Sequence, residues 1–105
     1  MRTVIRARDF ELTDAWRDQV ERRVRLAVTR FADRVDGVTV RIEQRVVRAE
    51  GVARYTSEIA MAPVGVLIRE EHDRIDRAID RAIDRSARVA ARLSRRHAPT
   101  PGHGS

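Results

Sequence analysis

The chain has 105 residues and a formal net charge of +6 at pH 7, a length that allows one two-layer core and is too short for two. It contains no cysteine, which excludes a disulfide framework, a thiolate nucleophile and a cysteine-ligated zinc site, and fits a reducing compartment. No apolar run resembles a signal peptide or a membrane span, so we expect a cytoplasmic protein without membrane contact. All 22 lysine-plus-arginine positions are arginine, the side chain that presents a planar fork of donors to phosphate.

The first 37 residues predict a strand followed by a helix. Residues 2–8 alternate, with Thr3, Ile5 and Ala7 on one side, as expected of a strand. A helix is then expected to begin at Thr13, whose hydroxyl can accept a hydrogen bond from an amide of the first turn. Its apolar face comprises Trp16, Val20, Val24, Ala27 and Phe31, and Trp16 is expected in the core. Asp36-Gly37 is expected to stop the helix, with Gly37 in the left-handed conformation.

The middle of the chain changes to a period of two residues, which indicates strands. Alternation is clear from Val38, resumes over residues 53–61 and returns over residues 64–70, whereas residues 45–51 are irregular. Pro63 cannot donate to a sheet ladder and is therefore expected at a tight connection between two strands.

Residues 73–96 are predicted to form one long helix with an apolar face that must be buried. This face comprises Ile75, Ile79, Ala82, Ile83, Ser86, Val89, Ala90 and Leu93. One flank carries Arg74, Arg81, Arg85, Arg88, Arg92 and Arg96, and the other carries Asp73, Asp76, Asp80 and Asp84. Charges sorted by sign favour a partner with regularly spaced negative charge, such as nucleic acid. A solvated surface with ion pairs one turn apart accounts for the same pattern equally well.

The order of elements, β-α-β-β-β-α, predicts a two-layer α+β fold in which two helices pack on one face of a four-stranded sheet. We expect residues 1–96 to form this domain and residues 97–105, which offer nothing to bury, to form a disordered tail. Whether the arginine flanks of the two helices merge depends on how the helices cross, which the sequence leaves open.

Positive charge is concentrated in the two helical segments and suggests RNA binding. The candidate RNA-binding residues are Arg22, Arg23, Arg30, Arg81, Arg85, Arg88 and Arg92. Nothing points to an enzyme or a cofactor, because the histidines and serines lack partners at catalytic spacing and no glycine-rich phosphate loop is present. The row Asp76, Asp80 and Asp84 could in principle hold a divalent ion, but no second cluster supplies the remaining ligands, so no metal is expected.

Three short motifs resemble the bacterial ribosome hibernation-promoting factors and ribosome-associated inhibitors. They are Leu12-Thr13-Asp14-Ala15-Trp16-Arg17-Asp18, then Phe31-Ala32-Asp33-Arg34-Val35, and the run from Ala78-Ile79-Asp80 to Ala82-Ile83-Asp84-Arg85. The resemblance implies the same fold over about residues 1–96, binding to ribosomal RNA of the small subunit, occlusion of the tRNA and mRNA paths, and inhibition of translation under stress. By position, Arg23, Arg85 and Arg88 match the family's basic helix sites, whereas the other four candidates follow from the helical wheel alone. Trp16, the inserted Ala32 and Ala62-Pro63 depart from the family pattern.

Two other classes of protein remain open. A double-stranded-RNA-binding domain has a similar element order, but it needs a lysine-rich start to its last helix, where this chain has Glu70-Glu71-His72-Asp73. A protein-interaction module of stress physiology would dock its arginine edge on an acidic protein. Because the chain ends soon after Arg96, without the second, self-associating domain of long family members, we expect a monomer that does not link ribosomes by itself.

Overall fold

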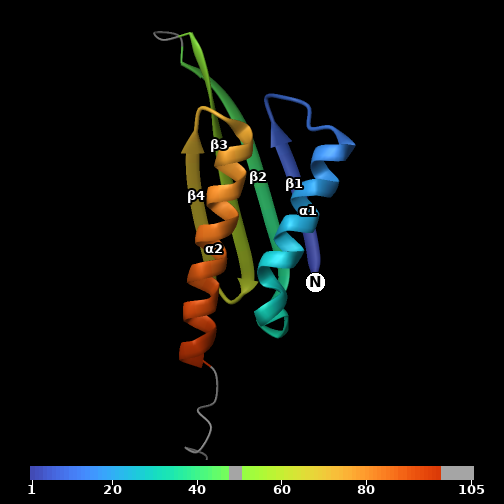
Figure 1. Ribbon diagram of the computed structural model, residues 1–105, viewed down its shortest axis with the longest axis vertical. Helices are drawn as coiled ribbons and strands as arrows, with labels where there is room; N and C mark the ends of the chain where they lie inside the picture. The colour runs from blue at the N-terminus through green and yellow to red at the C-terminus, as the bar shows by residue number, and fades with distance from the viewer. Residues whose placement is uncertain (48–50, 98–105) are drawn as a thin grey trace, which may run out of the picture.

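The computed structural model describes residues 1–47 and 51–97, with the elements in the predicted order (Figure 1). The helices and strands are β1 (Arg2–Arg8), α1 (Asp14–Val28), the short 3-10 helix η1 (Thr29–Arg34), β2 (Val35–Val47), β3 (Val52–Pro63), β4 (Val66–His72) and α2 (Ile75–His97). The expected tail falls mostly on residues 98–105, which lie outside the described residues.

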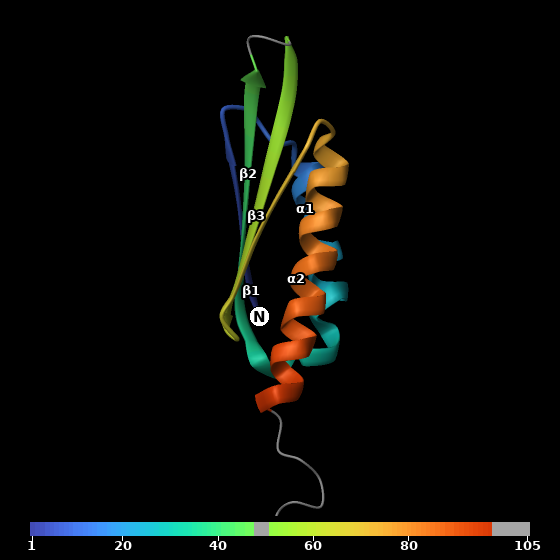
Figure 2. The ribbon, with the colours of Figure 1, turned by 90° about the vertical axis from the view of Figure 1, so that its left-hand side faces the viewer.

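The four strands form one sheet in the order β1-β2-β3-β4, with β1 parallel to β2 and the other neighbours antiparallel. One row of apolar residues crosses the whole sheet, because Val40 is opposite Ile5 and Ile59, and Ile59 is opposite Ile68. Both helices run side by side on the face to which this row points, and the opposite face is left uncovered (Figure 2). The predicted two-layer fold is confirmed.

The core lies between the sheet and the helices. It is built from the apolar residues that recur with helical spacing in the helices and at every second position in the strands. From α2, Ile79, Ala82, Ile83, Ser86 and Ala90 are buried as predicted, and Ile75, Val89 and Leu93 pack against them. Trp16 packs against the core from α1, as expected. Burial of each large side chain stabilises the fold by about 1.5–3 kcal/mol, so the apolar seam of α2 fixes which of its flanks can face solvent.

Helix α1 begins where predicted but ends differently. The Thr13 hydroxyl accepts a hydrogen bond from the Trp16 amide at 3.2 Å, which satisfies one of the amides that has no partner within the helix. The helix then passes into η1, and β2 begins at Val35. The prediction that Gly37 stops the helix in the left-handed conformation is therefore wrong, since Gly37 lies in β2, opposite Ala62 of β3. The segment Thr29–Arg34, which the prediction included in the first helix, instead forms the six-residue 3-10 helix η1.

A tight hairpin joins β3 to β4. Pro63 ends β3, and the Gly65 amide donates to the Met61 carbonyl oxygen at 3.1 Å. The expected position of Pro63 at this connection is confirmed, although β4 begins at Val66 rather than Val64 because the turn uses two residues.

Strands β2 and β3 are longer than their neighbours. The pairing of β1 with β2 ends at Arg8 opposite Glu43, and β4 pairs with β3 no further than Tyr55, whereas the β2–β3 ladder continues to Val47 opposite Val52. The two strands therefore project beyond the four-stranded part of the sheet as a two-stranded arm (Figure 1).

Candidate nucleic-acid interface

Of the three predicted residues of the first helical segment, Arg22 and Arg23 lie in α1 and Arg30 lies in η1. Arg22 and Arg30 are exposed, and Arg23 is partly buried, with an exposed side-chain fraction of 37%. Nη1 of Arg23 forms an ion pair with the Asp80 carboxylate of α2. Arg23 therefore marks the flank of α1 that faces the second helix.

The four predicted residues of α2 are all exposed. Arg85 forms an ion pair with Glu70 of β4 at 3.2 Å between Nη1 and Oε1, so it points toward the outer edge of the sheet. Arg81, Arg88 and Arg92 follow the same side of α2 at helical spacing. The arginine flank of α2 thus faces away from α1.

The aspartate flank of α2 lies between the two sets of arginines. Asp80 reaches α1, and Asp76 and Asp84 lie one turn before and after it on the same helix face. The arginines of α1 and α2 therefore do not merge into one stripe. They form two ridges on the outer surface of the helix layer, separated by aspartates, which answers the question that the sequence left open. We call Arg22, Arg23 and Arg30 the first ridge, and Arg81, Arg85, Arg88 and Arg92 the second.

The two ridges differ from an ordinary solvated surface in how few of their charges are paired. Within the described residues, five of the seven arginines make no ion pair or side-chain hydrogen bond, namely Arg22, Arg30, Arg81, Arg88 and Arg92. The interpretation of the α2 flanks as ion pairs one turn apart is thus not supported for Asp84 and Arg88. Unpaired guanidinium groups remain available to an anionic partner.

The aspartates show no arrangement suited to a metal ion. Asp80 pairs with Arg23, and Asp76 pairs with Arg74 at 3.1 Å. Among the described residues, no group of three or more His, Asp or Glu side chains is close enough to hold a metal.

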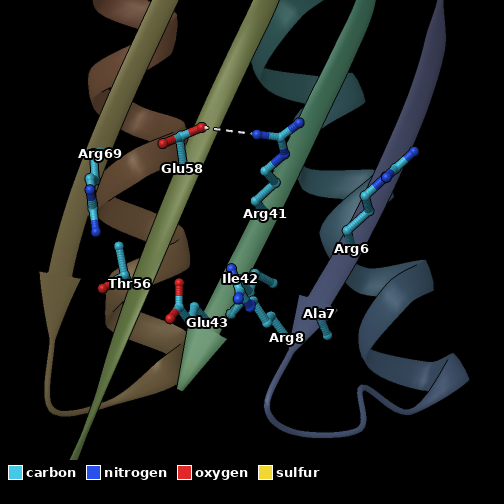
Figure 3. Close-up of a pocket in the computed structure, with 9 residues that line it drawn as sticks. All are labelled: Arg6, Ala7, Arg8, Arg41, Ile42, Glu43, Thr56, Glu58 and Arg69. Atoms are coloured by element: carbon cyan, nitrogen blue, oxygen red, sulfur yellow. Dashed lines mark ion pairs between the residues drawn. The ribbon is translucent and has the colours of Figure 1, made fainter. Parts of the chain in front are cut away.

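A further group of arginines escaped the sequence prediction. Arg6, Arg41 and Arg69 lie on three different strands but on one face of the sheet, opposite the helices (Figure 3). A helical wheel considers one element at a time, so it cannot bring them together. The available signal was the arginine at an outward position of each strand's alternation, but only the pairing register shows that these positions are neighbours.

No helix within the described residues is long and apolar enough to cross a membrane. The segment that precedes α2 carries Glu70, Glu71 and Asp73, the opposite of the basic helix start on which double-stranded-RNA-binding domains rely. What the fold and the surface define is a small, basic two-layer α+β domain with arginine ridges on its helices.

Sequence comparison identifies the family within this class. Residues 3–98 match the family described as sigma 54 modulation protein / S30EA ribosomal protein, and the chain belongs to that family. This confirms the resemblance inferred from the three motifs. No curated protein matches the sequence closely enough to add to this assignment.

Solved structures agree with the family assignment. The N-terminal domain of Protein Y from Thermus thermophilus is 29% identical, with a TM-score of 0.64 over 92% of this chain and 100% of that one. A ribosomal subunit interface protein from Coxiella burnetii has a TM-score of 0.62 over 94% of this chain and 100% of that one. At 12% identity, the second likeness concerns the fold alone. The family assignment associates the chain with the ribosome.

Proposed function

We propose that this protein is a ribosome hibernation factor that binds the small ribosomal subunit, occupies the paths of tRNA and mRNA, and inhibits translation under stress or in stationary phase. Its role is one of binding without catalysis or cofactors, and its place of action is the cytoplasm. The observation that carries the proposal is the pair of arginine ridges on the helix layer of a chain that belongs to a ribosomal protein family.

The charge of the ridges supports RNA as the contacted component. Ribosomal RNA presents regularly spaced phosphates, and guanidinium groups spaced one turn apart along a rigid helix can meet several of them at once. The two paired arginines remain accessible to RNA, because their ion pairs with Asp80 and Glu70 leave over a third of each arginine side chain exposed.

The double reversal Arg81→Glu/Arg88→Glu tests the proposal. These two residues are exposed and make no ion pair within the described chain, whereas a glutamate at position 85 would face Glu70. We expect binding to purified small subunits to be lost in sedimentation assays. The melting temperature should change little, because exposed substitutions usually shift the unfolding free energy by less than about 0.5 kcal/mol.

The control makes the same change of net charge at two other exposed helix positions. Arg25 is paired with Glu21 at 2.7 Å, and Arg77 lies at the end of the second ridge, one turn before Arg81, so Arg25→Glu/Arg77→Glu should weaken binding clearly less than Arg81→Glu/Arg88→Glu. For the wild-type protein, the logarithm of the binding constant should fall linearly with the logarithm of salt concentration, by about 0.7–0.9 per phosphate contact. Equal binding by the two double variants, or affinity independent of salt, would contradict the proposed mechanism.

A further inference from the structure

The face of the sheet that the helices leave uncovered is itself rich in arginine. One row of outward side chains runs across all four strands, because Arg41 is opposite both Arg6 and Glu58, and Glu58 is opposite Arg69. Arg8 follows Arg6 at the next outward position of β1, opposite Glu43 of β2. Figure 3 shows these side chains on the side of the sheet away from the helices.

The arrangement of this face is not the one that solubility or sheet stability favours. Arg6 is directly opposite Arg41, and Arg45 of β2 is directly opposite Arg54 of β3. Like charges directly opposite each other on neighbouring strands are destabilising. Arg41 is compensated by Glu58 at 3.8 Å, and Arg54 by Glu71 at 2.7 Å. Within the described residues Arg6, Arg8 and Arg69 have no ion-pair partner, so positive charge is left over on this face.

These arginines surround a hollow of about 430 Å³ that also contains an unpartnered hydroxyl group. Its charged lining residues are Arg6, Arg8, Arg41 and Arg69 with Glu43 and Glu58, which leaves a net positive charge. Thr56 lines the same hollow with only 5% of its surface exposed, and its Oγ1 has no hydrogen-bond partner within the described residues. Burying a hydroxyl without a partner carries a free-energy cost. The guanidinium groups are donors that a phosphate oxygen can accept from, and the Thr56 hydroxyl, whose oxygen is buried at the wall of the hollow, is a further donor without a partner in the described residues.

We propose that the uncovered face of the sheet is a second phosphate-binding surface, and that the hollow around Thr56 takes a phosphodiester group of a ribosomal RNA segment. The proposal rests on the proposed function and extends it. The helices that carry the two arginine ridges lie on the other side of the sheet (Figure 2), so the RNA segment at the sheet differs from the one at the helices. The domain is then wedged between two RNA segments, each held by one of its layers.

The first test removes two arginines that line the hollow. Arg6→Gln/Arg69→Gln should weaken binding to purified small subunits by on the order of tenfold. It should also reduce the salt slope by about one to two units, because each arginine that meets a phosphate contributes about one unit to that slope. The matched control is Arg25→Gln/Arg77→Gln, which removes the same charge from the helix layer and should reduce the slope less, because Arg25 is paired with Glu21 and Arg77 lies only at the end of the second ridge. If the two variants bind alike, the second surface does not exist.

The second test uses the Thr56 hydroxyl. Thr56→Val removes a buried donor of nearly the same shape, so the melting temperature should stay the same or rise, because the unpartnered group is gone. Binding to the small subunit should nevertheless weaken several-fold. A purely structural role predicts unchanged binding, and that result would overturn the assignment of the hollow.

The third test identifies the contacted molecule. The chain has no cysteine, and it offers one exposed leucine on each face, Leu26 of α1 and Leu67 of β4, which are 71% and 67% exposed. Iron-chelate probes on Leu26→Cys and Leu67→Cys should cleave different segments of ribosomal RNA through local hydroxyl radicals. If Leu67→Cys cleaves no RNA, the face does not bind RNA and a protein contact replaces it.

The outcomes separate the two proposals. If wild-type protein fails to bind small subunits, the proposed function falls and this inference falls with it. If wild-type protein binds and Arg81→Glu/Arg88→Glu does not, while Arg6→Gln/Arg69→Gln and Thr56→Val bind normally, the proposed function stands and the sheet surface alone is refuted.

Discussion

Two glycines show how one residue type serves different purposes in this chain. Gly65 has a φ of 78° in the turn between β3 and β4, a conformation that is costly for residues with a Cβ atom. Gly37 lies within β2, where an added Cβ would make only an ordinary contact of 3.7 Å with the Arg2 carbonyl oxygen. The sequence predicted the left-handed role for Gly37 because Asp-Gly after a helical pattern is a typical stop signal. It could not show that η1 would intervene, since a short 3-10 helix leaves no periodic pattern.

This difference leads to opposite expectations for the two Gly→Ala variants. Gly65→Ala should lower the unfolding free energy by about 1–2 kcal/mol, because a left-handed conformation is unfavourable for alanine. Gly37→Ala should be neutral or stabilise by up to about 1 kcal/mol, because alanine restricts the unfolded chain more than glycine does. Urea denaturation followed by circular dichroism measures both. A severe loss of stability in Gly37→Ala would mean that the placement of this residue in β2 is wrong.

The helices and strands were predictable to the extent that burial dictates their pattern. The seam of α2 from Ile75 to Leu93 is buried or partly buried throughout. An apolar stripe of this length leaves water only when the helix turns that side toward the sheet, so the rotation of α2 about its axis is fixed. The relation between charged flanks on different elements was not predictable. The pair Arg23–Asp80 depends on how α1 and α2 are rotated toward each other, and the neighbours Arg6, Arg41 and Arg69 depend on strand register.

The Arg23–Asp80 ion pair leads to a prediction about the first ridge. Asp80→Asn should release Arg23 and tighten binding to the small subunit several-fold, while changing stability by no more than about 1 kcal/mol, as is usual for ion pairs exposed to solvent. Asp84→Asn removes an equal charge from an exposed carboxylate with no ion-pair partner within the described residues and serves as the control.

Repeating both substitutions in an Arg23→Gln background isolates the coupling between Arg23 and Asp80. The gain from Asp80→Asn should then shrink to the gain from Asp84→Asn, which reflects net charge alone. An undiminished gain would show that Arg23 takes no part in binding.

At the scale of the whole molecule, positive charge lies on both broad faces. The helix layer carries the two arginine ridges, and the uncovered face of the sheet carries Arg6, Arg8, Arg41 and Arg69. Stacking two copies through either face would bring like charges together at low ionic strength. The same distribution suits a domain inserted between two strongly negative surfaces, since neither broad face is then left without a partner.

This charge distribution predicts that the free protein is a monomer and that it inactivates ribosomes singly. Sedimentation equilibrium at low salt should give the mass of one chain, 12.0 kDa, because electrostatic repulsion opposes pairing through the faces.

Purified protein added to purified ribosomes should inhibit an in vitro translation reaction and leave the ribosomes at the single-particle position of a sucrose gradient. Arg81→Glu/Arg88→Glu should lose the inhibition, and Arg25→Glu/Arg77→Glu should keep most of it. Paired ribosomes formed with no other factor present would show that this domain joins particles, contrary to the repulsion expected between its arginine-rich faces.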